Sequence, residues 1–151
     1  MKFLLPALLL AAPAFAAENV QLKSEVLVER SVTGADGTVT TTYEPPKTVV
    51  PGDRVRIVLD YINAGDAPAT RFTVTNPLPG AVAYTSASTA GSEVSVDGGK
   101  SWGQLGALTV ANPDGTRRPA EGGDVSHIRW VLQAPIAPKA GGKLSFNGVV
   151  R

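Results

Sequence analysis

The chain contains no cysteine and only one histidine, His127, among its 151 residues. The lack of cysteine excludes disulfide bonds, thiolate zinc sites and a cysteine nucleophile. A single histidine excludes a zinc site built on two histidines and leaves few ways to assemble an acid–base pair. We therefore expect a fold held by its core and its turns, with no enzyme activity and no cofactor.

An excess of charge of one sign is also missing. The chain has 14 lysines and arginines and 13 aspartates and glutamates, with a sequence pI near 8.0. A nucleic-acid-binding domain usually shows a basic patch or a high isoelectric point. The only adjacent pair of arginines, Arg117 and Arg118, fits a solvated loop. We therefore expect no nucleic-acid partner.

The one long apolar run covers residues 3–12, which is far short of the roughly 20 residues that span a bilayer. Ala14 and Ala16 follow it in the small-x-small pattern that signal peptidase reads. We expect residues 1–16 to be a signal peptide cleaved after Ala16, with cleavage after Ala17 as the alternative. The mature chain would then lack a transmembrane segment and lie in the periplasm, in the cell envelope or outside the cell.

Glycine and proline are abundant, with 16 and 12 residues, and residues 17–151 show no convincing helical period. The clearest alternation is in residues 54–62, where Val55, Ile57 and Leu59 share one face and charged residues share the other. Such alternation predicts a half-buried antiparallel strand. Further strands are expected at residues 20–30, 38–43, 71–76, 82–84, 93–96, 101–102, 127–133 and 143–151, and residues 112–123 are expected to form one long polar loop.

Short strands at intervals of roughly 8–12 residues favour an all-β fold, an immunoglobulin-like antiparallel β-sandwich of about 7–9 strands. The first two strands flank a turn at residues 34–37 and form an additional N-terminal hairpin. We expect three parts: the signal peptide at residues 1–16, an N-terminal strand and hairpin extension at 17–47, and the sandwich domain at 48–151.

Four segments carry a resemblance to a known module. They are residues 50–61 (Val-Pro-Gly-Asp and the strand after it), 62–69 (Ile-Asn-Ala-Gly-Asp-Ala-Pro-Ala), 72–80 (Phe-Thr-Val-Thr-Asn-Pro-Leu-Pro-Gly), and 127–132 followed by 142–146. In this order they resemble the conserved-repeat domain of unknown function, family eleven, of bacterial and archaeal surface proteins. The resemblance covers about Thr48 to Arg151 and implies an immunoglobulin-like module of the cell surface, here present in a single copy.

Trp102 is the one candidate ligand contact. It follows a Gly-Gly turn at residues 97–100, and an exposed indole there could stack on a sugar ring, although packing against the turn is the competing interpretation. Trp130 alternates with Ile128 and is expected in the core. The single histidine shares the outer face of that strand and is expected at the surface. The loop aspartates fit turn chemistry, and a calcium site built from several loops is the alternative.

Two functions of different classes follow from these features. The first is an exported structural or interaction module of the cell envelope or surface without catalytic activity, whose partner is another envelope protein or the chain itself, through edge strands. The second is a soluble periplasmic ligand-binding protein, with a glycan as its ligand, that uses Trp102.

Overall fold

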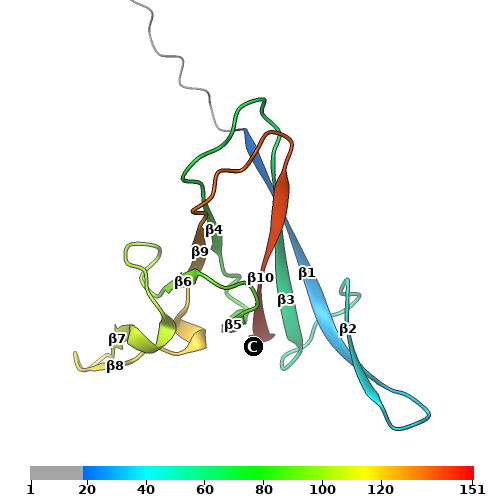
Figure 1. Cartoon of the computed structure of the whole chain (residues 1–151). Helices are drawn as coiled ribbons and strands as arrows, with labels where there is room; N and C mark the ends of the chain where they lie inside the picture. The colour runs from blue at the N-terminus through cyan, green and yellow to red at the C-terminus, as the bar shows by residue number, and fades with distance from the viewer. Residues whose placement is uncertain (1–18) are drawn as a thin grey trace, which may run out of the picture.

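A computed structural model describes residues 19–151, so the expected signal peptide and its cleavage site at Ala16 or Ala17 lie outside the described residues. The described part is all-β and antiparallel, as expected (Figure 1). Two short 3₁₀ turns, Leu105–Ala107 and Gly122–Asp124, interrupt the strands. The strands are β1 Val20–Thr33, β2 Val39–Glu44, β3 Arg54–Asn63, β4 Thr73–Pro77, β5 Val82–Ala87, β6 Ser92–Ser95, β7 Thr109–Ala111, β8 Arg117–Pro119, β9 His127–Val131 and β10 Gly141–Val150.

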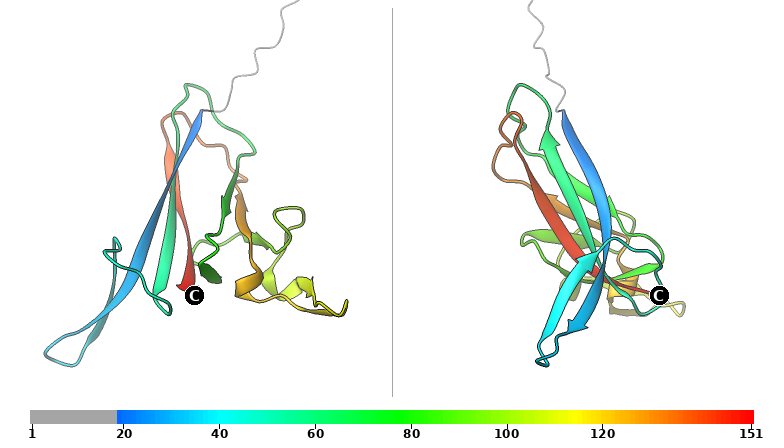
Figure 2. Two further views of the ribbon diagram at one scale, coloured as in Figure 1. Left: turned by 180° about the vertical axis from the view of Figure 1, so that it is seen from behind. Right: turned by 90° about the vertical axis from the view of Figure 1, so that its right-hand side faces the viewer.

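The strands form two facing sheets and a small separate hairpin. The larger sheet has the order β2-β1-β3-β10-β5, the smaller sheet has the order β4-β9-β6, and β7 and β8 form a two-stranded sheet. From β3 to β6, and again from β9 to β10, the chain passes from one sheet to the other at every connection. The β1–β2 hairpin and the β7–β8 hairpin project from opposite sides of the body (Figures 1 and 2).

The core lies between the two sheets and contains side chains from both. Val55, Ile57 and Leu59 of β3 are buried, while Arg54 on the opposite face is exposed, so the alternation predicted for this strand is confirmed. Trp130 of the smaller sheet packs against Phe146 of the larger one, with ring centroids 6.3 Å apart. Period-two patterning places these apolar side chains on one face of each strand.

The N-terminal hairpin forms as predicted, and β1 continues to Thr33, three residues beyond the predicted end. Gly37 in its turn has a φ of 80°, a conformation that glycine adopts without steric cost. The Asp36 carboxylate accepts a hydrogen bond from the Thr38 N–H at 3.0 Å, which lowers the pKa of that carboxyl group. The turn residues therefore determine the hairpin register locally.

Two of the local predictions are wrong in the segments at residues 71–76 and 112–123. Residues 112–123 are not one loop, because residues 117–119 pair with residues 109–111 as β8 and β7. The Arg117 guanidinium donates to the Thr109 carbonyl oxygen across this pair, and the turn between the strands is closed by the Asn112 N–H, which donates to the Thr116 carbonyl oxygen at 2.7 Å. The predicted strand at residues 71–76 begins instead at Thr73, because Arg71 has a φ of 54°, which no strand residue adopts.

Candidate functional site

One edge of the larger sheet is open along the first half of β1. Residues 20–28 of β1 pair with β3 on one side, whereas β2 occupies the other side only from residue 28 to residue 33. Within residues 19–151, no strand pairs with the second side of residues 20–27. In Figures 1 and 2 this segment of β1 is the blue strand that has β3 as its sole strand neighbour.

The backbone groups on this open side can be assigned from neighbouring hydrogen bonds. The Asn19 carbonyl oxygen accepts a hydrogen bond from the Ala64 N–H, on the side of β1 that faces β3. The Gly34 N–H donates to the Thr38 carbonyl oxygen, on the side that faces β2. Because successive residues of a strand point their N–H and C=O groups to opposite sides, odd-numbered residues of β1 face β3 and even-numbered residues face the β2 side. The N–H and C=O groups of Val20, Leu22, Ser24 and Val26 therefore point to the open side.

The side chains of this segment divide into an apolar face and a charged face. Leu22 and Val26 face the core side, yet they are 44% and 37% exposed, whereas Val28 on the same face is 1% exposed. The core therefore covers β1 only near Val28. Lys23 and Glu25 are exposed on the outer face. An open edge with one uncovered apolar face is a template for strand addition.

A second cluster lies on the outer face of the smaller sheet. Trp102 is half-buried, and the Arg129 guanidinium lies 4.5 Å from its ring centroid, a cation–π contact. Arg129 is held by Glu93 on the neighbouring strand, with Nε and Nη2 at 2.9 and 2.8 Å from one carboxylate oxygen. The His127 ring meets the indole edge-on, with centroids 6.3 Å apart. Trp102 thus packs against β9, and Arg129 covers part of its ring surface.

The loop before Trp102 is an aspartate-centred turn. The predicted hairpin there reduces to a single bridge between Val94 and Gly103. Asp97 accepts hydrogen bonds from the Ser95 hydroxyl at 2.7 Å and from the Ser101 hydroxyl at 2.6 Å, as well as from two backbone N–H groups. These hydrogen bonds hold the pKa of Asp97 well below its ordinary value, and the bond from the Ser101 hydroxyl has the largest effect. Its oxygens are engaged in closing the turn.

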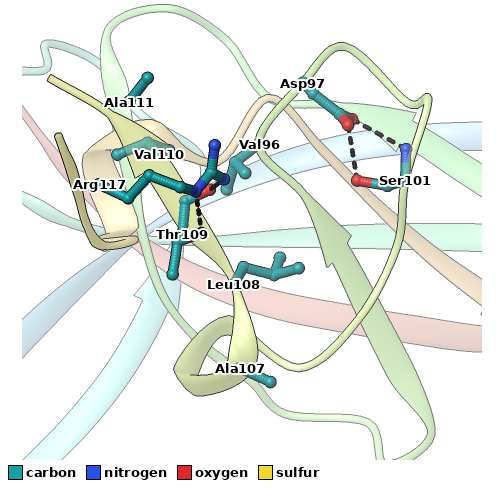
Figure 3. Close-up of a pocket in the computed structure, with 9 residues that line it drawn as sticks. All are labelled: Val96, Asp97, Ser101, Ala107, Leu108, Thr109, Val110, Ala111 and Arg117. Atoms are coloured by element: carbon teal, nitrogen blue, oxygen red, sulfur yellow. Dashed lines mark hydrogen bonds between the residues drawn. The ribbon is translucent and has the colours of Figure 1, made fainter. Parts of the chain in front are cut away.

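A shallow cavity of about 420 Å³ lies between this turn and the β7–β8 hairpin (Figure 3). Its polar groups are bonded to one another. Asp97 binds Ser101, and Arg117 donates to the Thr109 hydroxyl and carbonyl oxygen, each at 2.7 Å. Arg118, next along the chain, pairs with both oxygens of Asp124 at 2.7 Å. A ligand in this cavity would therefore meet polar side chains whose hydrogen bonds are already made within the chain.

His127 has one hydroxyl neighbour, Ser126, with Nδ1 and Oγ 3.1 Å apart. That hydroxyl donates to the Ser95 carbonyl oxygen at 3.1 Å and accepts from the Gly98 N–H at 3.0 Å. Its proton is therefore directed away from the imidazole, unlike that of an activated serine. Within residues 19–151, no three His, Asp or Glu side chains are grouped to hold a metal ion, and no helix has the length and apolar composition to cross a bilayer.

Sequence reasoning named Trp102 but missed its contact with Arg129 of β9 and the ion pair that Arg129 makes with Glu93 of β6. It also missed the position of the open segment of β1. The alternation of charge at Lys23 and Glu25 was the available signal for that segment. No protein-family model, curated protein or solved structure matches this chain.

Proposed function

We propose that this chain is an exported, non-catalytic structural or interaction module of the cell envelope or surface, and that it binds its partner by strand addition at β1. The observation that carries the proposal is the open edge at residues 20–27, where backbone groups with no strand partner among residues 19–151 adjoin the exposed side chains of Leu22 and Val26. In a central strand the backbone N–H and C=O groups are hydrogen-bonded to neighbouring strands on both sides, whereas the open side of this strand can pair with a strand of another chain.

The proposal includes an immunoglobulin-like fold for the sandwich and kinship to the conserved-repeat surface modules. Its support is the ordered set of segments described above, together with two facing antiparallel sheets between which the chain crosses repeatedly. The second of these segments, residues 62–69, includes Asn63 and begins the loop that links β3 of the larger sheet to β4 of the smaller sheet. Residues 1–16 supply the route of export.

The second candidate, glycan binding, has one specific observation in its favour. Trp102 is only half-buried and lies on the open outer face of the smaller sheet. Stacking of a sugar would have to use the part of the indole that Arg129 leaves free. Binding to a broad glycan array that is lost in Trp102→Ala and kept in the edge variant Leu22→Ala would favour this function over strand addition.

Photo-crosslinking in producing cells tests the main proposal. A photoreactive benzoyl-phenylalanine at Leu22 should form adducts with an envelope protein or with the chain itself, because that side chain lies beside the open edge. The same group at Thr75, exposed on β4 of the smaller sheet, is the matched control. Adducts from Leu22 alone support the proposal. Equal adducts from both positions, or none from either, contradict it.

A further inference from the structure

We propose that the partner of the open edge is a second copy of this chain, and that the two copies of β1 pair antiparallel about a two-fold axis at Ser24. The two larger sheets would then form one continuous sheet across the dimer. This inference rests on the proposed function above and goes beyond it, because it names the partner and the register.

The side chains of the open segment are complementary to themselves. With Ser24 opposite Ser24, Lys23 lies opposite Glu25 of the second copy, and Leu22 lies opposite Val26 of the second copy. Each of these contacts occurs twice, because a two-fold interface uses the same surface on both copies. The charged pairs lie on the outer face, and the apolar pairs lie on the face that the core leaves exposed.

The backbone groups agree with the same register. Leu22, Ser24 and Val26 point their N–H and C=O groups to the open side, as shown by the hydrogen bonds at Asn19 and Gly34. In the proposed register these residues meet one another, Leu22 with Val26 and Ser24 with Ser24. Each meeting is a hydrogen-bonded pair that exchanges two N–H···O bonds. The open-side backbone groups of Leu22, Ser24 and Val26 are thereby paired.

Neighbouring registers are disfavoured by charge. A shift that keeps the hydrogen-bonding pattern places either Lys23 opposite Lys23 or Glu25 opposite Glu25. Like charges directly opposite each other destabilise a strand pair, whereas opposite charges contribute roughly 0.2–1 kcal/mol. The alternation of Lys23 and Glu25 around Ser24 thus selects one register. An unrelated strand would not reproduce this match, which is why the second copy is favoured as the occupant.

The geometry also limits the assembly to two copies. β2 occupies the same edge from Val28 onward, with Glu44 opposite Val28, so the new pairing is confined to residues 21–27 of each copy. Because both copies contribute the same segment, the interface closes on itself and leaves no equivalent edge for a third copy. The expected product is a dimer rather than a filament.

Charge reversal tests the register. Residues 17–151 contain every described strand, and the mass of this form is measured by light scattering after size exclusion across a concentration series. In Lys23→Glu, two attractive pairs become repulsive, so the dissociation constant of the dimer should rise roughly tenfold or more. The double variant Lys23→Glu/Glu25→Lys restores opposite charges and should return the constant to near its original value. Lys100→Glu, in an exposed turn of the smaller sheet, is the control and should have no effect.

Lys23 also lies beside Asp60 of β3 in the sheet register, so a change of fold must be distinguished from a change of association. A single cysteine provides that distinction. Ser24→Cys places two thiols on the axis, roughly 5.5 Å apart between Cα atoms, which is within the range of a disulfide. With an added thiol oxidant, this variant should form a covalent dimer. Gln21→Cys on the same segment should not, because Gln21 faces Leu27 of the second copy.

The outcomes separate the two proposals. A monomer at every concentration, or equal crosslinking of both cysteine variants, overturns the dimer. So does a dimer whose dissociation constant is unchanged by Lys23→Glu or is not restored in the double variant. If the chain is monomeric while a photoreactive group at Leu22 captures a different envelope protein, the proposed function stands and the second copy is not the partner.

Discussion

Asn63 is a buried amide that ties together two loops at the end of the sandwich where β3 ends. Its side chain is 1% exposed. Nδ2 donates to the carbonyl oxygens of Ala67 at 2.8 Å and Ile136 at 2.9 Å, and Oδ1 accepts from the Gly65 N–H at 3.0 Å. One amide thus adds to the backbone bridge between Ala69 and Ile136, which joins the same two loops. The substitution Asn63→Ala should therefore be costly.

The magnitude follows from the three hydrogen bonds. Each contributes about 1 kcal/mol net, and a buried group left without a partner costs about 1–3 kcal/mol. Partial access of water to the loop carbonyl groups offsets some of that cost. We expect Asn63→Ala to lower the free energy of unfolding by about 3 kcal/mol. Asn63→Asp keeps the acceptor but directs a carboxylate at two carbonyl oxygens, so it should destabilise the protein at least as much at neutral pH.

Equilibrium unfolding in urea, followed by the fluorescence of the buried Trp130, measures this change. Asn76→Ala is the matched control, because Asn76 makes one exposed hydrogen bond, to the carbonyl oxygen of the adjacent Pro77. Its expected cost is below about 1 kcal/mol. If the two alanine variants unfold at the same urea concentration, the amide of Asn63 does not hold the loops, and this reasoning fails.

Two further predictions concern backbone approach and pH. A Cβ at Gly122 would overlap the Tyr84 carbonyl oxygen, so Gly122→Ala should lower the thermal midpoint of unfolding by several degrees. The control is Gly106→Ala, which has open space around its Cβ position and should change the midpoint little. Similar midpoints for the two variants would contradict the close approach of Gly122 to Tyr84. In the folded state the pKa of Asp97 is lowered from 3.8, chiefly by the hydrogen bond from the Ser101 hydroxyl. The stability that this carboxylate contributes is therefore complete above the pKa of the unfolded state, and it is lost as the pH falls through the lower pKa of the folded state. The stability of Asp97→Asn should therefore fall less steeply than that of the parent chain between roughly pH 5 and pH 2, and parallel pH profiles would contradict the role of this carboxylate.

The sequence alone determined the strand character of the chain and several of its elements. Alternation at Val55, Ile57 and Leu59 predicted which face of β3 is buried, because side chains of a strand point alternately to opposite sides. Turn residues predicted the N-terminal hairpin in the same way, since Asp36 and Gly37 act on their own neighbours. These features depend on residues that are close in the chain, so local patterns contain the information.

The tertiary structure alone decided which strands are neighbours and which edge stays open. Three contacts could not be predicted from local sequence patterns, because these patterns do not indicate which segments meet. They are the position of β10 between β3 and β5, the packing of Trp102 on Arg129, and the pairing of β7 with β8. The open segment of β1 is of the same kind, because an edge is defined by the strand that is missing beside it. Its charges at Lys23 and Glu25 were visible in the sequence, but their meaning depends on the larger sheet, which leaves the backbone groups of Leu22, Ser24 and Val26 without a strand partner among residues 19–151.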